Sequence, residues 1–177
     1  MCTKKGQVKK TSLEQYSRPR SNGINAITIK DEDELLEAKL TTGNSQILMA
    51  VKSGKCIRFE EGKTRPMGRN ASGVRGVRLK DDNDEVVGML SVNDMDSDIL
   101  VVSENGYGKR SKLDDYRITN RGGKGVKTIS ITDKTGNLVS IKNVSDGDDL
   151  MIINKSGIAI RMEVNSLRVM GLSLIHI

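Results

Sequence analysis

The sequence predicts an all-β protein of repeated four-stranded blades, arranged in the manner of a propeller. Short spans of alternating apolar and polar residues, rich in β-branched side chains, are separated by Gly, Asn, Asp and Ser. This pattern is typical of many short strands. Two sets of glycines recur about every 50 residues. No window keeps a 3.6-residue apolar period for three turns, so helix is expected only as single turns.

The alternation places each strand between turn-forming residues. The expected strands are 5–10, 24–30, 35–41, 46–51, 55–60, 74–80, 86–92, 98–103, 107–112, 125–131, 138–144, 149–154 and 158–164. Asn105-Gly106 and Thr135-Gly136-Asn137 are expected to form hairpin turns, because Gly and Asn accept positive φ. Single helical turns are expected at Leu13–Tyr16 and Leu113–Tyr116.

The two glycine sets keep the same period independently. Members of the first set follow basic residues and precede a strand; they are Gly23, Gly73 and Gly125, 50 and 52 residues apart. Members of the second set follow a short apolar run; they are Gly54, Gly106 and Gly157, 52 and 51 residues apart. About four strands in each period correspond to one propeller-like blade. The expected repeats are roughly 1–65, 66–116 and 117–167.

The first glycine set lies in three segments that we call the glycine loops, residues 18–29, 67–79 and 120–131. Glycine lets the backbone bend and approach a partner closely. Arg guanidinium groups in the same loops suit phosphate oxygens. The expected contacts to a polyanion are Arg69, Arg75, Arg121 and Lys124 first, then Arg18, Arg20, Arg78, Lys109, Arg110 and Lys127.

Composition favours a double-stranded polyanion. The chain holds 29 Lys and Arg against 23 Asp and Glu, a net charge of +6, which suggests an acidic or polyanionic partner. Three Tyr and one Phe are its only aromatic residues. Because single strands are usually held by stacking on exposed rings, a duplex backbone is the expected polyanion.

Other features point to an intracellular protein without a metal. Cys2 and Cys56 lack metal-ligand spacing and are interpreted as reduced, incidental thiols. No apolar run approaches the length of a membrane helix, and the lysine-rich start lacks the apolar core of a signal peptide. The acidic clusters are interpreted as solvated tips between strands, because none has the ligand pattern of a calcium loop.

Catalysis within this chain is not expected. The single histidine, His176, lies in an atypical tail, residues 172–177. The lysine among glycines at 122–125 lacks the spacing and the Ser or Thr of a nucleotide-binding loop. Covalent catalysis by a tyrosine nucleophile needs a nearby base, an arginine and metal-binding carboxylates. The tyrosines are instead interpreted as packing residues; they are Tyr16, Tyr107 and Tyr116.

Two motifs resemble a known family. Gly68-Arg69-Asn70-Ala71-Ser72-Gly73-Val74-Arg75-Gly76-Val77-Arg78-Leu79, followed by Asn105-Gly106-Tyr107-Gly108-Lys109-Arg110, resembles the C-terminal domain of the bacterial DNA gyrase A subunit. The resemblance covers about residues 2–171. It implies a β-pinwheel, a ring of six four-stranded blades whose basic rim bends duplex DNA. Residues 1–171 would supply three to three and a half blades, an incomplete ring.

The resemblance also implies a function and partners. The chain would be the DNA-wrapping segment of a gyrase A subunit, supporting ATP-dependent negative supercoiling inside a bacterial cell, associated with the nucleoid. The catalytic N-terminal region of that subunit and the gyrase B subunit would be its partners. No cofactor is expected in this chain, and the ATP and magnesium of the enzyme would bind elsewhere. An incomplete ring leaves sheet edges uncovered, so isolated chains are expected to associate or to fray at their ends.

Departures from the family pattern leave two alternatives open. The family's signature box, Gln-Arg-Arg-Gly-Gly-Lys-Gly, is matched only in part by residues 119–125, whose first two positions differ. A C-terminal domain of the topoisomerase IV subunit, which serves decatenation and has a degenerate box, therefore stays an alternative. The other is a propeller-like module that uses its positive charge to bind an acidic protein.

Overall fold

The computed structural model describes residues 1–172. Residues 173–177, which include His176 and nearly all of the atypical tail, lie outside the described residues. The described chain forms strands, turns and four single 3₁₀ turns, with no α-helix. This confirms the all-β prediction.

Two four-stranded antiparallel sheets form the first half of the molecule. The first has the spatial order β3 (Leu35–Glu37), β1 (Cys2–Thr3), β2 (Gln7–Val8) and β6 (Val74–Arg75). The second has the order β10 (Val126–Lys127), β5 (Lys55–Glu60), β4 (Gln46–Val51) and β7 (Val86–Val92). Each sheet is built around one hairpin. We call the first hairpin with its sheet unit 1 and the second hairpin with its sheet unit 2.

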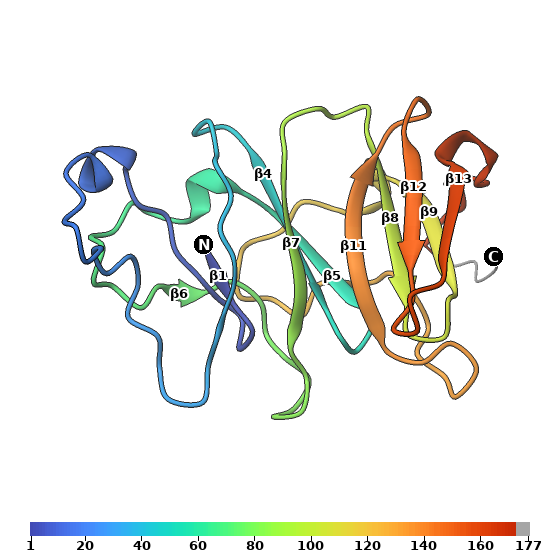
Figure 1. The fold of residues 1–177 in the computed structure, drawn as a ribbon, viewed down its shortest axis with the longest axis horizontal. Helices are drawn as coiled ribbons and strands as arrows, with labels where there is room; N and C mark the ends of the chain where they lie inside the picture. Colours follow the sequence, from blue (N-terminus) through green and yellow to red (C-terminus); the bar gives the residue numbers. More distant parts are fainter. Residues whose placement is uncertain (173–177) are drawn as a thin grey trace.

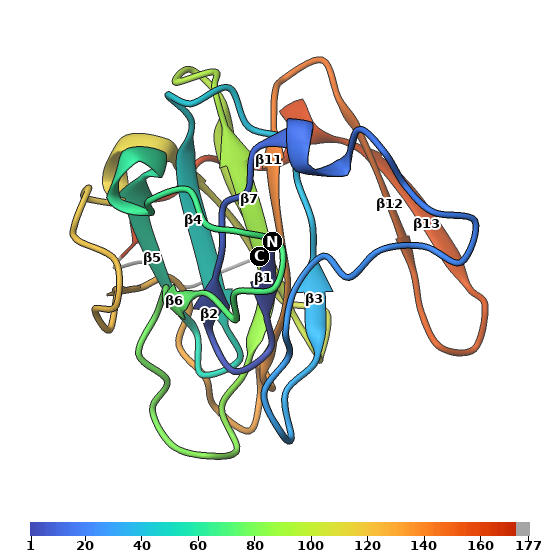
Figure 2. The same cartoon turned by 90° about the vertical axis from the view of Figure 1, so that its left-hand side faces the viewer.

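Two smaller sheets complete the described chain. Unit 3 has the order β11 (Leu138–Val144), β8 (Asp98–Ser103) and β9 (Gly108–Lys112). Unit 4 is the hairpin of β12 (Asp149–Ile153) and β13 (Ala159–Glu163). Figure 1 shows the sheets following one another along the long axis, with unit 1 at one end and unit 4 at the other. The view in Figure 2 looks along this row from the end of unit 1.

Two strands pair with the hairpin of the preceding unit, and we call them exchanged strands. β6 follows the hairpin of unit 2 in the chain but pairs with β2 of unit 1. β10 follows the hairpin of unit 3 but pairs with β5 of unit 2. The glycines of the first set permit this approach. Gly73 has a φ of +94°, and a Cβ there would lie 2.7 Å from the carbonyl oxygen of Val8. Gly125 has a φ of +72° and equally little room beside Cys56, so neither position accepts a side chain without strain.

The hydrophobic core lies between successive sheets. One cluster joins units 1 and 2 and includes Val8, Met49 and Phe59. The largest cluster joins units 2 and 3, and a small one lies between unit 3 and Val164 of unit 4. Successive sheets therefore pack face to face, as the blades of a propeller do.

Most predicted strands are confirmed, and the exceptions share a physical cause. The hairpin strands and β7 and β11 lie where the alternation places them. The expected strands 74–80 and 125–131 are only two residues long, because after β6 and β10 the chain leaves the sheet of the preceding unit. The stretch 24–30 forms no strand and pairs with no hairpin among residues 1–172. The short strand β1 was not predicted.

The 3₁₀ turns recur at one point in every unit. They directly follow the second strand of the hairpin, apart from a short connection in unit 1, and are η1 (Leu13–Tyr16), η2 (Glu61–Lys63), η3 (Leu113–Asp115) and η4 (Val164–Ser166). The two turns predicted from sequence are confirmed as η1 and η3. Cys2 and Cys56 are both buried and unpaired.

Candidate nucleic-acid interface

The three glycine loops lie side by side although they are about 50 residues apart in sequence. The backbone N–H of Thr28 donates to the carbonyl of Ala71 at 3.4 Å, joining the first loop to the second. The N–H of Arg78 donates to the carbonyl of Gly123 at 2.8 Å, joining the second to the third. A further bond of 2.6 Å runs from the N–H of Gly122 to the carbonyl of Gly76. The loops therefore form one continuous row.

Two arginines make the same contact between successive loops. Arg69 Nη1 donates to the carbonyl of Asn25 at 3.2 Å. Arg121 Nη1 donates to the carbonyl of Arg75 at 3.1 Å, and its Nε donates to the carbonyl of Lys63 at 2.9 Å. Both side chains are half-buried. These guanidinium groups fix the spacing of the row, and within residues 1–172 some of their five donors have no partner.

The other predicted loop cations are exposed. They are Arg18, Arg20, Arg75, Arg78, Lys124 and Lys127. They belong to the same row of loops and have no ion-pair partner among residues 1–172. Guanidinium and ammonium groups without a carboxylate partner can contact phosphate oxygens. Their role as DNA contacts stays a prediction.

Lys109 and Arg110 do not lie on this surface, and their prediction as DNA contacts is wrong. Lys109 is 1% exposed; its Nζ donates to the carbonyl of Thr128, and burial lowers its pKa to about 8. Arg110 is 4% exposed and forms ion pairs with Asp98 and Asp146. Both residues lie on a hairpin strand that faces other units, so their charged groups bind partners inside the protein.

The sequence analysis missed one recurring set of exposed cations. These residues are Arg65, Arg117 and Arg168, and all three are exposed. Each directly precedes a residue that forms a parallel bridge to the hairpin of the preceding unit. The bridge partners on those hairpins are Lys10, Arg58 and Arg110. The separations of the three exposed arginines, 52 and 51 residues, follow the period of the glycines. Extending the search for the period from glycines to arginines would have found them. Arg65 and Arg117 add charge just ahead of the second and third glycine loops.

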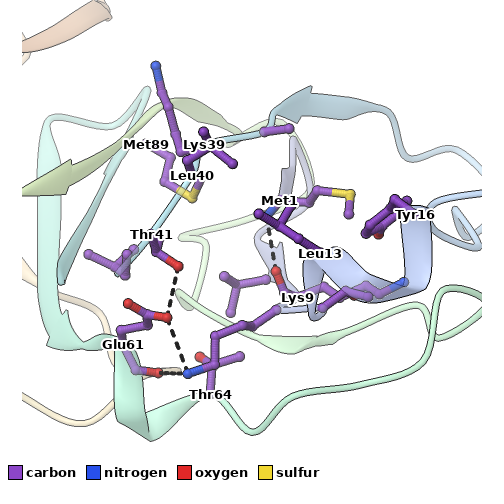
Figure 3. A pocket seen from close by; sticks show the side chains of 15 residues that line it. Met1, Lys9, Leu13, Tyr16, Lys39, Leu40, Thr41, Glu61, Thr64 and Met89 are labelled. Atoms are coloured by element: carbon purple, nitrogen blue, oxygen red, sulfur yellow. Dashed lines mark hydrogen bonds and ion pairs between the residues drawn. The ribbon is translucent and has the colours of Figure 1, made fainter. Parts of the chain in front are cut away.

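A cavity of about 230 Å³ lies between units 1 and 2 and is lined mainly by apolar side chains. Figure 3 shows Leu13, Tyr16, Leu40 and Met89 around it, with Glu61 at one wall. Burial raises the pKa of the Glu61 carboxyl, but hydrogen bonds from Thr41, Ser45 and Gly43 and the nearby charge of Lys10 together outweigh it, so the pKa is lowered. This carboxylate is fully engaged in holding the loop before β4.

The tyrosines make structural contacts. Tyr116 is buried in the core between units 2 and 3, where its hydroxyl hydrogen bonds to Thr128 Oγ1. Lys134 Nζ lies 5.6 Å from the ring centre of Tyr107. In residues 1–172 no three His, Cys, Asp or Glu side chains gather as metal ligands. The same residues contain no helix with the length and apolarity to span a membrane.

The strongest comparison is with a family of protein domains. The family model described as "DNA gyrase C-terminal domain, beta-propeller" matches residues 1–42, 45–93, 97–145 and 148–171. The DNA gyrase A subunit of Staphylococcus epidermidis is 45% identical over 94% of this chain and 19% of its own length. That of Staphylococcus aureus is 46% identical over 92% of this chain and 18% of its own length. The chain thus spans about a fifth of these curated relatives.

Solved structures share the fold. A DNA gyrase A C-terminal domain matches 96% of this chain and 56% of its own, with a TM-score of 0.84 and 26% identity. A C-terminal domain of DNA topoisomerase IV matches 96% of this chain and 53% of its own, with a TM-score of 0.90 and 24% identity. The latter likeness concerns the fold alone. With the family model matching nearly the whole chain, this protein belongs to the DNA gyrase C-terminal domain family.

Proposed function

We propose that this chain binds duplex DNA along the row of glycine loops and bends it, as the wrapping segment of a DNA gyrase A subunit. The observation that carries the proposal is the direct hydrogen bonding of successive loops, from Thr28 to Ala71 and from Arg78 to Gly123. These bonds bring cations from three distant parts of the sequence into one row.

The chemistry of the row suits phosphates better than base edges. Its cations lie on loops and on the short edge strands β6 and β10, and no α-helix is present among residues 1–172 to enter a major groove. Lys and Arg release condensed counterions when they contact phosphates, so affinity should fall steeply with salt. Few aromatic residues are available for stacking on bases.

A row of several weak contacts can also bend DNA. Smooth bending of about 20–30 base pairs by 40–90° requires about 1–6 kcal/mol. Contacts to phosphates spread over three loops together offset this free energy. Arg69 and Arg121 support the arrangement, since they tie each loop to the one before it.

The decisive experiment neutralises exposed cations of the row. Changing Arg75, Arg78, Lys124 and Lys127 together to Gln should weaken binding to duplex DNA and reduce the slope of log K against log salt by about 3–4. All four side chains are exposed, and folding should be retained. Filter binding or fluorescence anisotropy over a salt series measures both quantities.

A matched control removes the same number of charges elsewhere. Lys5, Lys134, Lys142 and Lys155 are exposed and lie outside the glycine loops. Their replacement by Gln should change the slope much less. Equal slopes for the two quadruple variants would contradict the proposal that the row is the binding surface.

Wrapping is tested separately from binding. With relaxed DNA circles and a relaxing enzyme, wrapping should trap superhelical turns of one sign. A protein-binding module of the same fold should trap none. Loss of trapping with binding retained would exclude the wrapping role and favour a function of the topoisomerase IV type.

The proposal places this segment in a larger enzyme. The catalytic N-terminal region of a gyrase A subunit and a gyrase B subunit would be its partners, within a type II topoisomerase of the bacterial cytoplasm and nucleoid. ATP and magnesium would be used by those other parts. The role of this chain would be to set the path of the DNA.

A further inference from the structure

Two buried lysines bind the backbone of the glycine loops. Lys9 is 2% exposed, and its Nζ donates to the carbonyl of Ala26 in the first loop at 2.6 Å. The same Nζ donates to the carbonyl of Arg69 in the second loop. Lys109 is 1% exposed, and its Nζ donates to the carbonyl of Thr128 in the third loop at 3.3 Å. Each ammonium group is therefore buried against a loop that also carries exposed cations.

The contact to the first loop and the contact to the third loop have the same register. Each lysine lies three residues after the glycine at the turn of its hairpin, Gly6 in unit 1 and Gly106 in unit 3. Each accepting carbonyl lies three residues after the first-set glycine of the same repeat, Gly23 or Gly125. The chain thus makes one contact twice, with equivalent positions of two repeats.

A tyrosine accompanies each lysine. Tyr16 and Tyr116 lie seven residues after the two lysines. The hydroxyl of Tyr16 donates to the carbonyl of Ala26 at 3.5 Å, and the hydroxyl of Tyr116 hydrogen bonds to Thr128 Oγ1. The N–H of Thr128 also donates to the carbonyl of Gly54 at 2.9 Å. In both repeats a lysine and a tyrosine therefore hold the same residue of the loop.

Unit 2 fixes its glycine loop in a different way. The residues at the lysine and tyrosine positions are Ile57 and Thr64. The residue at the acceptor position is Gly76, where a Cβ would lie 2.6 Å from Met49 Sδ and 3.0 Å from the side chain of Val8. Close packing of the backbone on the core therefore takes the place of the lysine contact. Ile57 also shows that an apolar side chain is accepted at the lysine position.

The burial of the two ammonium groups is not compensated by a carboxylate. Neither Lys9 nor Lys109 forms an ion pair among residues 1–172. Burial lowers the pKa of both amines, and the charge of Arg69 lowers that of Lys9 further. Burying an unpaired charge is unfavourable, whereas a Met side chain would occupy similar space without that cost. The lysines therefore add little to global stability, and their effect is to orient the loop carbonyls.

We propose that Lys9 and Lys109 are positioning residues for DNA binding: their buried ammonium groups hold the first and third glycine loops in the conformation that contacts the DNA backbone. Lys9 binds the carbonyl of Arg69, and the acceptor of Lys109 directly follows Lys127. Each lysine thus fixes the backbone at or beside a predicted phosphate contact without touching DNA itself. The inference rests on the proposed function and assigns to it two residues that lie outside the binding surface.

The salt dependence of binding separates a positioning residue from a contact residue. A loop that already has its bound conformation avoids the cost of being ordered on binding, and this contribution is the same at every salt concentration. The salt slope instead counts the phosphates that are contacted. Lys9→Met and Lys109→Met should each weaken DNA binding by about three- to tenfold with an unchanged slope. Fluorescence anisotropy over a salt series measures both quantities.

Amide hydrogen exchange tests the loop order without DNA. Exchange should become faster at residues 24–29 in Lys9→Met and at residues 126–131 in Lys109→Met, while urea denaturation shows no loss in the free energy of unfolding. Tyr116→Phe removes a hydroxyl bound to the third loop and should also speed exchange at 126–131. Ile57→Met is the matched control, because it changes an apolar side chain at the lysine position of unit 2. It should leave loop exchange and DNA affinity unchanged.

Several results would overturn the proposal. Loop exchange equal to that of the unaltered chain, an unchanged affinity or a changed salt slope in the lysine variants would each do so. A large loss of global stability in both variants would also contradict it, because the lysines would then support the whole fold. Failure of the proposed function appears in a different measurement: the quadruple variant of exposed row cations would keep the salt slope of its control, whatever the loop exchange of the lysine variants.

Discussion

The basic residues of this molecule fall into two regions with opposite roles. Between the units, Arg58 and Arg110 are buried and donate to backbone carbonyls of the next unit. Along the glycine loops, Arg75, Arg78 and Lys124 are exposed and have no carboxylate partner in residues 1–172. The first group holds the row of units together, and the second gives the row a charged surface.

The difference teaches that register decides the role of a cation in this fold. Arg58 and Arg110 lie four residues after glycines of the second set, on a strand that faces the next unit. Arg75 lies two residues after a glycine of the first set, at the edge of an exchanged strand. All three residues carry the same positive charge, so charge does not distinguish the two buried arginines from Arg75. Their separation in sequence from the nearest repeat glycine does.

The largest expected effect comes from Arg110. Arg110→Met removes the buried ion-pair partner of Asp98 and a donor to the carbonyl of Val164, and leaves Asp98 with the exposed Lys112 alone. Breaking a buried ion pair by removing one partner destabilises a protein by about 3–5 kcal/mol, and the remaining pair with Lys112 places the expected loss at the lower end of this range. Urea denaturation should show this loss in the free energy of unfolding.

Arg161→Met is the matched control, because Arg161 has the same register in unit 4 but an exposed ion pair. Exposed pairs contribute about 0–1 kcal/mol. Similar losses in the two variants, measured at a concentration where the chain is monomeric, would show that burial does not separate the two roles.

A smaller effect is expected from the pH dependence of Lys109. Burial lowers its pKa from 10.5 to about 8, so between these values the unfolded chain binds more protons than the folded one. Stability then rises with pH across this window, and the unfavourable burial of the charge is fully present below it. Relative to Lys109→Met, the free energy of unfolding should rise by about 1–3 kcal/mol from neutral pH to about pH 10.5. A constant difference would argue that the lysine is charged throughout.

The smallest effect compares single lysines in DNA binding. Lys124→Gln removes one exposed cation of the row and should reduce the salt slope of binding by about 0.9. Lys109→Met removes a buried one and should leave the slope unchanged. If Lys109→Met changed the salt slope while the fold was retained, Lys109 would have to be counted among the DNA contacts.

The sequence predicted the fold through its period and its alternation. The strands at 86–92, 98–103 and 138–144 have the bounds expected from the apolar pattern, because each has residues that are buried against a neighbouring unit. The pattern did not reveal that β6 and β10 pair outside their own unit. Exchange of a strand leaves the local alternation unchanged, so only long-range pairing can show it.

The candidate site was predicted in part for a related reason. Loop cations such as Arg75 and Lys124 are exposed as expected, since glycine-rich loops lie at the surface. The burial of Arg110 depends on Asp98 and Asp146, of which the second belongs to the connection into the next unit. No local pattern shows that this carboxylate approaches the arginine from the connection between two units.

The pairing of β6 and β10 with the preceding units has a consequence for how the protein unfolds. Cleavage of the backbone between η3 and β10 would release an edge strand from the sheet of unit 2, although the cut lies more than 50 residues beyond β5. Loss of one sheet therefore exposes an edge of another, and opening should spread along the row instead of stopping at a single unit. Limited proteolysis should consequently yield few stable fragments of one period.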